Sequence, residues 1–264
     1  MQKIDVKSMA NQILDHVASV PNKMKSLLIL YAGDDPASAS YMRGKIKDCN
    51  RCGIPYMQVR VHDQEDLLEM IHAGNEDDTV GGIMVQLPLP FGFNEEEAIA
   101  AIDPKKDVDG FTPNSPFSPC TPEGIVYIMH KELGEDLSGK RALIVGRGKL
   151  VGRPLYEMLQ YTENMSVMQV GSSEKQLDEI VRGLEWSTWD CIVTATGKAD
   201  LILLESAESK IVIDAGITRS NGHITGDCYG FSDAYKETMR VTTVPGGVGL
   251  MTRAILMLHM LRVQ

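Results

Sequence analysis

A tyrosine and a lysine one helical turn apart are the residues of this chain whose types and spacing best suit chemistry. Tyr41 and Lys45 stand at spacing i, i+4 in the segment SYMRGKIK, so both side chains leave the same face of a helix. A lysine carries protons near neutral pH only if burial or polar neighbours bring its pKa well below about 10.4. The pair therefore predicts an acid–base group, provided that the fold buries Lys45.

Three further polar segments could converge on this pair. Gln86 ends the apolar run GGIMVQ, Asp107 and Asp109 lie in KKDVDGF, and a glycine-rich PGGVG occupies 245–249. A glutamine that closes an apolar strand could orient a lysine without adding charge. Taken one at a time, the same residues also fit a solvated lysine, a structural glutamine and a turn aspartate, and both interpretations stay open at this point.

Composition and charge limit the classes of function. The 264 residues suffice for two domains, and 43% hydrophobic with 23% charged residues are typical of a soluble globular protein. The formal net charge of −10 argues against a nucleic-acid partner, which needs clustered cations. The N-terminal segment has no apolar signal region, and the run LLILYA is too short to cross a membrane. We expect a cytoplasmic protein with no membrane partner.

The cysteines indicate neither a disulfide framework nor a metal site. There are five, an odd number, and Cys49 and Cys52 have CxxC spacing with no second pair or nearby histidine to complete a zinc site. Both fall late in an expected helix, whereas a redox CxxC is expected near a helix start, where the dipole lowers the thiol pKa. We therefore predict no metal.

Helical and strand-like patterns alternate along the chain, which indicates an α/β protein with a mostly parallel sheet. In the first half, helices are expected at 6–18, 38–52, 64–74 and 94–101, and strands at 26–32, 55–61 and 81–86. The proline-rich stretch 111–122 then separates two halves, and Thr121 with Pro122 fits the N-cap and first position of a new helix.

The second half repeats the alternation. Strands are expected at 141–145, 166–170, 190–195, 210–215 and 241–244, with helices from the glycine loop to about Tyr161 and over 249–262. The last helix is strongly apolar and is expected to return to the first domain. The expected division is 1–119 plus 245–264 for one domain and 120–244 for the other.

Glycines 146, 148 and 152 lie between an expected strand and an expected helix. Their GxGxxxG spacing is one residue longer than that of the usual dinucleotide fingerprint. Such glycines let the backbone approach a pyrophosphate at a helix N-terminus. Arg147 and Ser172 could hold a 2′-phosphate, whereas Glu174 comes slightly late for a ribose-binding acid, so NADP is favoured and NAD stays possible. A simple tight turn is the alternative interpretation of the loop.

Several segments in a fixed order resemble the methylenetetrahydrofolate dehydrogenase/cyclohydrolase family of folate one-carbon metabolism. They are PASASYMRGK, GGIMVQLPLP, DPKKDVDGF, PCTPEGI, LSGKRALIVGRGKLVGRP, IDAGIT, the GD at 226–227 and TTVPGGVGLMT. The resemblance runs nearly end to end. The order of QLPLP, KDVDGF and VPGGVG is its most specific part.

The resemblance implies a folate-binding domain and a Rossmann-like NADP domain with a cleft between them, usually in a homodimer. It implies NADP-dependent oxidation of 5,10-methylenetetrahydrofolate and hydrolysis of the methenyl product to 10-formyltetrahydrofolate. By motif, the catalytic positions are Tyr41, Lys45, Gln86 and Asp109. The folate-contacting positions add Leu87, Pro88, Pro245, Gly246, Gly247, Val248 and Gly249. The cofactor positions are Gly146, Arg147, Gly148, Ser172 and Ile217.

The chain departs from the family pattern mainly on the cofactor half. Gly148 stands where the family has serine, Gly171 where it has histidine, and the stretch after DGF is short. Thr243 and Leu250 replace prolines beside PGGVG. Two alternatives therefore remain: a cyclohydrolase with weak or lost dehydrogenase activity, and a non-catalytic folate- or nucleotide-binding protein.

Overall fold

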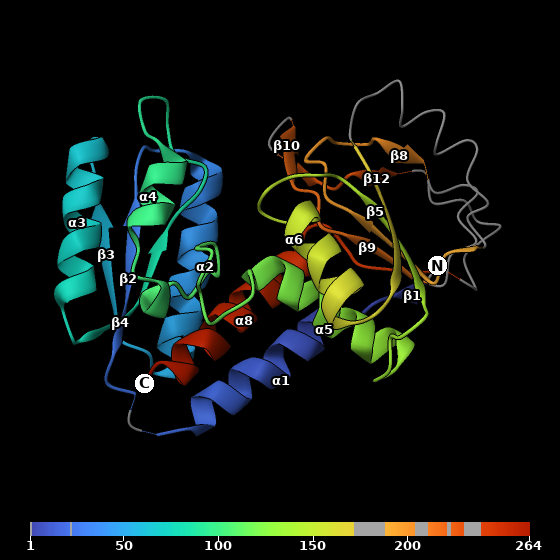
Figure 1. The fold of residues 1–264 in the computed structure, drawn as a ribbon, viewed down its shortest axis with the longest axis horizontal. Coiled ribbons are helices and arrows are strands. Elements are labelled where there is room, and N and C mark those ends of the chain that lie inside the picture. The colour runs from blue at the N-terminus through green and yellow to red at the C-terminus, as the bar shows by residue number, and fades with distance from the viewer. Residues whose placement is uncertain (1, 22, 172–187, 204–210, 221–222, 230–238) are drawn as a thin grey trace. The chain divides into compact units, whose positions relative to one another are not determined.

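The computed structural model describes residues 2–21, 23–171, 188–203, 211–220, 223–229 and 239–264. The chain folds into two compact units (Figure 1). The lysine unit consists of Ala10–Cys120 with Arg253–Gln264, and the glycine-loop unit consists of Met1–Met9 with Thr121–Thr252. No helix among the described residues is both long and apolar enough to span a membrane.

This division differs from the expected boundaries at both ends of the chain. Strand β1 (Gln2–Lys3) pairs with β13 (Arg240–Val241), so the N-terminal residues join the sheet of the glycine-loop unit. Helix α8 (Val248–Arg262) is shared, since residues up to Thr252 belong to the glycine-loop unit and only Arg253 onward to the lysine unit. A two-residue strand has no periodicity of its own, which is why the sequence does not reveal β1.

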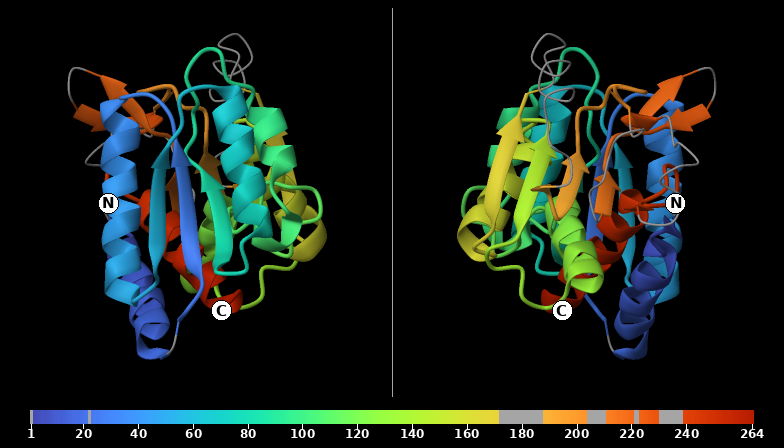
Figure 2. Two further views of the ribbon diagram at one scale, coloured as in Figure 1. Left: turned by 90° about the vertical axis from the view of Figure 1, so that its left-hand side faces the viewer. Right: turned by 90° about the vertical axis from the view of Figure 1, so that its right-hand side faces the viewer.

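The lysine unit is built on a three-stranded parallel sheet. Strands β2 (Ser26–Tyr31), β3 (Tyr56–Arg60) and β4 (Val80–Val85) lie in the order β3-β2-β4. Figure 2 (left) shows the three arrows pointing the same way between helices. The helices are α1 (Val6–Ser19, of which Ala10 onward belongs here), α2 (Pro36–Cys52), α3 (Gln64–Glu76), α4 (Glu95–Ala101) and the short η1 (Pro104–Lys106). The expected elements of this half are confirmed to within about two residues.

The two faces of β4 serve different purposes. Ile83 and Val85 pack into an apolar cluster with residues of α3 and α4. Side chains alternate along a strand, so Met84 and Gln86 point to the opposite face. A side chain at Gly82, on that same face, would come within 2.5 Å of the Met260 sulfur of α8. The sheet therefore presents its apolar face to α3 and α4 and directs Gln86 to the other side.

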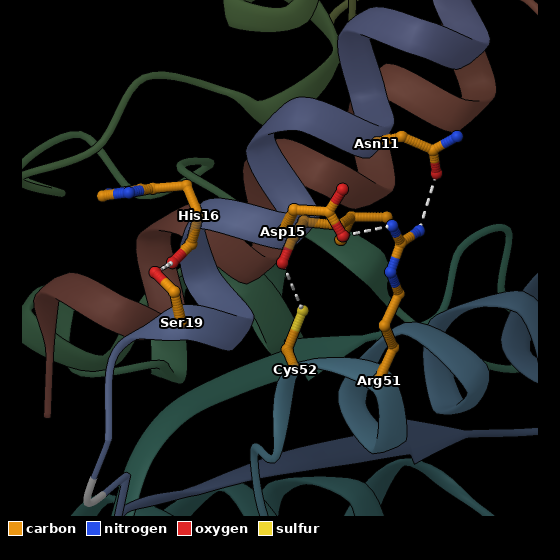
Figure 3. Close-up of polar contacts among 7 residues, drawn as sticks. Asn11, Asp15, His16, Ser19, Arg51 and Cys52 are labelled. Atoms are coloured by element: carbon orange, nitrogen blue, oxygen red, sulfur yellow. Dashed lines mark hydrogen bonds and ion pairs between the residues drawn. The ribbon is translucent and has the colours of Figure 1, made fainter.

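Helix α2 is held at both ends. Asp35 caps its start by accepting a hydrogen bond from the Ser38 backbone N–H at 2.7 Å, and Gly53 ends it in a left-handed conformation. Near its end Arg51 donates to Asn11 and Asp15 of α1, both at 2.6 Å (Figure 3). These contacts fix the register of α2 and with it the place of Lys45.

The CxxC cysteines of α2 are buried free thiols. Burial raises the pKa of Cys49 to about 12 and that of Cys52 to about 11. The Cys52 sulfur lies 3.7 Å from the Leu14 carbonyl oxygen of α1. Both side chains therefore stay protonated near neutral pH and pack in the core.

The glycine-loop unit contains a six-stranded parallel sheet in the order β1-β13-β9-β7-β5-β6. Its further strands are β5 (Arg141–Val145), β6 (Ser166–Val170), β7 (Cys191–Thr194) and β9 (Ile211–Asp214). Smaller pairs are β8 (Ile202–Leu203) with β12 (Cys228–Tyr229) and the hairpin β10 (Thr218–Ser220) with β11 (His223–Thr225). The expected parallel α/β sheet is confirmed; these smaller pairs are additions that the sequence did not predict.

The helices of this unit follow the predicted pattern with one correction. Helix α5 (Cys120–Leu133) begins at Cys120, so Thr121 lies in its first turn and is not its N-cap. The Thr121 hydroxyl lies 3.0 Å from that of Thr252. After the glycine loop, α6 (Gly152–Glu157) continues as the π-helical turn η2 (Met158–Thr162), which ends close to the expected Tyr161.

Candidate active site

Lys45 of α2 is buried against the end of β4 in the lysine unit. Only 5% of its surface is exposed, and its Nζ donates a hydrogen bond to Gln86 Oε1 at 3.1 Å. The same nitrogen lies 3.3 Å from the Met84 sulfur and 4.9 Å from the centre of the Tyr41 ring. The structure thus brings Tyr41, Lys45 and Gln86 together and adds Met84, a contact that no sequence pattern indicated.

The orientation of Gln86 is fixed by its own hydrogen bonds. Its backbone N–H donates to Leu30 O at 2.8 Å, which extends the pairing of β4 beyond Val85. Its side-chain Nε2 donates to Leu87 O at 2.7 Å. Since the amide nitrogen is engaged there, the amide oxygen faces Lys45 as a neutral acceptor. Leu87 is half-buried and Pro88 exposed directly after it.

Burial changes the protonation of this group. Desolvation lowers the pKa of Lys45, nearby Asp109 and Cys120 oppose that shift, and Arg253 adds to it. Desolvation also raises the pKa of Asp109, while Lys45 lowers it. For both residues burial favours the uncharged form. Lys45 therefore loses its proton at a lower pH than a solvated lysine does.

Arg253 of α8 lies beside this site and was not identified from the sequence. Its Nε is 3.1 Å from Asp48 Oδ2 on α2. A side chain at Gly44 would overlap the Arg253 guanidinium, so the glycine next to Lys45 leaves the space that this ion pair occupies. The positive charge of Arg253 is one reason why the pKa of Lys45 is low.

The two aspartates of KKDVDGF have different surroundings. Asp107 is 1% exposed, and its carboxylate accepts hydrogen bonds from the backbone N–H groups of Gly110 at 2.9 Å and Thr112 at 2.6 Å. Gly110 has φ +79°, and a side chain there would come within 2.4 Å of the Ser118 carbonyl oxygen. Asp107 therefore builds the turn, whereas the half-buried Asp109 that follows lies near Lys45 and the Cys120 thiol.

The lysine before Asp107 anchors the same segment. Lys106 Nζ donates to three backbone carbonyls at the end of α3: Gly74 at 2.9 Å, Asn75 at 2.8 Å and Asp77 at 2.7 Å. A cation at this position satisfies carbonyls that have no partner within the helix. The start of the Asp109 loop is thus fixed to the C-terminal end of α3.

The glycine loop follows β5 in the other unit. Gly146 has φ +131°, and a side chain there would lie 2.3 Å from the Ala195 carbonyl oxygen. Gln169 Nε2 donates to the carbonyls of Gly146 at 3.0 Å and Gly152 at 2.8 Å, which holds the loop closed. Among the described residues other than its chain neighbours, none has an atom within 4 Å of where a side chain on Gly148 would begin. This tight turn with open space at its tip suits the backbone approach that a dinucleotide pyrophosphate needs.

Arg147 reaches from the loop to the end of β6. Its Nη2 donates to Gln169 O at 3.0 Å, and its Cδ lies 4.0 Å from where a side chain on Gly171 would begin. Ser172 and Glu174, the other residues considered for reading the ribose, lie outside the described residues. Ile217 is 56% exposed after β9.

The PGGVG segment lies in the glycine-loop unit, where Pro245 to Gly247 form the turn before α8 and Val248 and Gly249 begin the helix. Pro245 and Gly246 are exposed, Gly247 and Val248 are buried, and Gly249 lies between these extremes. A side chain at Gly247 would come within 2.4 Å of the Thr243 carbonyl oxygen.

Comparison with known proteins assigns both halves of the chain. Residues 4–109 match the family model described as the tetrahydrofolate dehydrogenase/cyclohydrolase catalytic domain, and residues 119–264 match its NAD(P)-binding domain. The Bifunctional protein FolD of Acetivibrio thermocellus is 40% identical over 245 residues, covering 88% of this chain and 83% of that protein. The same-named protein of Streptococcus equi subsp. equi is 37% identical and covers 97% and 95%.

Solved structures agree with this assignment. The bifunctional FolD enzyme from Campylobacter jejuni superposes with a TM-score of 0.86 at 32% identity, covering 100% of this chain and 98% of that one. The Trypanosoma brucei enzyme, solved with NADP cofactor and inhibitor, superposes with a TM-score of 0.88 at 26% identity, covering 99% and 96%.

The different surroundings of the two aspartates predict different losses of stability. Asp107→Asn should lower the free energy of unfolding by about 1–3 kcal/mol, because its NH₂ group leaves a buried backbone N–H without an acceptor. Asp109→Asn should cost less than about 1 kcal/mol, since burial already favours the uncharged side chain. Denaturant unfolding of both variants near pH 7 measures the difference. A larger loss for Asp109→Asn would contradict these roles.

Proposed function

This chain belongs to the tetrahydrofolate dehydrogenase/cyclohydrolase family, and we propose that Lys45 is the proton carrier of its hydrolytic step. The enzyme acts in folate one-carbon metabolism. It oxidises 5,10-methylenetetrahydrofolate with NADP⁺ and hydrolyses the resulting 5,10-methenyltetrahydrofolate to 10-formyltetrahydrofolate. The observation that carries the proposal is the hydrogen bond between the buried Lys45 amine and Gln86.

In the hydrolytic step a water oxygen bonds to the methenyl carbon, and the bond from that carbon to N5 then breaks. The neutral amine of Lys45 accepts a proton as the water attacks. The resulting ammonium group returns that proton to N5 as N5 leaves. The hydroxyl proton of the adduct is released to solvent as the formyl C=O forms, so the reaction yields one H⁺. An acid–base group with a pKa nearer to the working pH performs both transfers better than an ordinary lysine would.

The neighbours of Lys45 orient the amine for this task. A neutral amine has two N–H groups and one lone pair. Gln86 Oε1 at 3.1 Å accepts one N–H, and the Met84 sulfur at 3.3 Å lies where it can accept the second. With both N–H groups held by uncharged acceptors, the lone pair remains for the attacking water.

The folate itself is held by side chains of the predicted set. We assign Asp109 to the N–H donors of the pterin ring, and Tyr41 to packing against the bound folate. Asp109 suits this role because Asp107, and not Asp109, accepts the backbone hydrogen bonds that build the turn. The further proposed substrate contacts are Leu87, Pro88, Pro245, Gly246, Gly247, Val248 and Gly249.

The glycine-loop unit binds NADP. The chemistry supplied by the bound cofactor is acceptance of a hydride from the methylene carbon. We assign Gly146 and Gly148 to the pyrophosphate, because the loop tip is open there. Arg147 is assigned to the 2′-phosphate, and Ser172 and Ile217 to further contacts. Gly148 and Gly171 offer no side-chain donor, so we propose a weaker preference for NADP⁺ over NAD⁺ than in typical relatives, with NAD⁺ as a usable alternative.

We expect Lys45→Met to lower cyclohydrolase turnover by roughly 10²–10⁴-fold while folate binding stays largely intact. Methionine keeps the length and apolar stem of the side chain and removes only the proton-carrying amine. Following NADPH formation and methenyl absorbance in one assay separates oxidation from hydrolysis. The exposed Lys47→Met on the same helix is the matched control and should behave like wild type. Hydrolysis by Lys45→Met within about threefold of wild type would refute the assignment.

Arg147→Ala should shrink the preference for NADP⁺ over NAD⁺ by at least about tenfold. A charge-assisted hydrogen bond to the 2′-phosphate is worth roughly 1.5–3 kcal/mol, and only NADP⁺ has that phosphate. The measurement is kcat/KM with each cofactor. Arg153→Ala, an exposed cation on α6, should leave the ratio unchanged. An unchanged ratio in Arg147→Ala, or a wild type that prefers NAD⁺ outright, would rule out Arg147 as the phosphate reader.

A homodimer and a cytoplasmic location complete the proposal. Among the described residues β6 pairs only with β5 and therefore lies at one edge of the sheet. An edge strand is a common site of pairing between chains. Met168 on β6 is 40% exposed and Tyr161 just before it 78%. We expect light scattering to give twice the chain mass of 29.1 kDa. Met168→Lys should shift the measured mass toward that of one chain. A monomeric wild type would contradict the dimer without affecting the proposed chemistry.

A further inference from the structure

His259 is a fully buried titratable residue that the proposed mechanism does not use. It lies on α8 within the lysine unit and has 0% exposure. Its Nδ1 is 2.8 Å from the Val108 carbonyl oxygen and 3.6 Å from the Cys120 sulfur. Its ring stacks on Phe117 with a centre-to-centre distance of 4.3 Å. Two segments far apart in the sequence, residues 108–120 and helix α8, therefore meet at this ring.

The protonation of the ring follows from this geometry. A carbonyl oxygen only accepts hydrogen bonds, so Nδ1 must carry a hydrogen and donate it to Val108 O. The Cys120 thiol also donates to Val108 O, at 3.3 Å. Two donors from outside the loop thus converge on the carbonyl that immediately precedes Asp109.

The backbone on the other side of Asp109 is held as well. The Cys120 backbone N–H donates to Asp109 O at 3.2 Å. Val108 is 0% exposed, and its packing restricts rotation of the peptide that joins it to Asp109. His259 and Cys120 therefore fix the two peptide groups that flank the Asp109 side chain.

We propose that His259 is a positioning residue that sets the direction of the Asp109 carboxyl group, and thereby the affinity for folate. The inference rests on the proposed role of Asp109. His259 acts through the Val108–Asp109 peptide and through its stack with Phe117, without touching the folate. Without the His259 N–H, the buried Val108 carbonyl keeps only the Cys120 thiol of these two donors. The Val108–Asp109 peptide can then rotate, and the Asp109 carboxyl group turns away from the folate.

The test compares His259→Leu, which removes the donor, with His259→Asn, whose amide keeps an N–H. Calorimetry with 10-formyltetrahydrofolate gives the affinity, and steady-state hydrolysis gives kcat and KM. His259→Leu should weaken affinity and raise KM about tenfold while kcat changes less than about threefold, because Lys45 is untouched. His259→Asn should restore most of the affinity. Ile71→Val, a buried change on α3, is the control for lost stability alone and should leave KM unchanged.

A double-mutant cycle separates this inference from the role of Asp109 itself. In the Asp109→Asn background, His259→Leu should change the affinity by less than about twofold. If Asp109→Asn binds folate as tightly as wild type, the proposed role of Asp109 fails. If Asp109→Asn weakens binding but His259→Leu does not, or adds its full effect on top, the positioning role alone fails.

A second variant keeps the test decisive should His259→Leu not fold. Phe117→Leu removes the stacked ring and leaves the His259 hydrogen bond in place. It should weaken folate affinity by a few-fold in the wild type and by nothing measurable in Asp109→Asn. An equal loss in both backgrounds would overturn the proposal.

Discussion

The burial of one lysine amine against uncharged partners is the interaction on which the rest of the site depends. Taking an ammonium group out of water is costly, so Lys45 is tolerated at 5% exposure because an amide oxygen and a thioether accept its N–H groups. A carboxylate in direct contact would instead hold the lysine charged. Burial therefore lowers the pKa of Lys45, and the neutral Gln86 does not offset that shift as a carboxylate in its place would.

The surrounding elements make this burial possible. The capped ends of α2 set the position of Lys45, and the alternation of β4 places Met84 and Gln86 on one face. Arg253 lies over Gly44 with Asp48 as its partner, so a second cation stands near the amine and disfavours its protonation. The loop carrying Asp109 is fixed at its start by Lys106 and Asp107, at the Val108 carbonyl by His259, and on both sides of Asp109 by Cys120. Each functional side chain thus sits on backbone held by other residues.

In the cofactor half, the backbone and not a buried side chain is the main structural feature. Its glycine loop is closed by Gln169, which holds the carbonyls of Gly146 and Gly152 and leaves the loop tip open. Affinity for a dinucleotide there comes from backbone groups that any sequence with these glycines supplies, whereas discrimination between cofactors depends on side chains. Because Gly148 and Gly171 lack side chains, the proposed discrimination between the two cofactors rests more heavily on Arg147.

The sequence by itself determined the α/β class, the order of the elements, the Tyr41–Lys45 pair and the glycine loop, because each is written in local periodicity or in spacing within a few residues. The family resemblance also favoured Asp109 over Asp107 as a folate contact. It did not reveal the structural difference, which is that Asp107 builds the turn. Only the tertiary structure decided that Met84, Arg253, Cys120 and His259 join the site and that the N-terminal strand joins the second sheet. Those contacts link residues as far apart as Val108 and His259, separated by 151 positions, and no local pattern encodes which distant side chains will share a buried space.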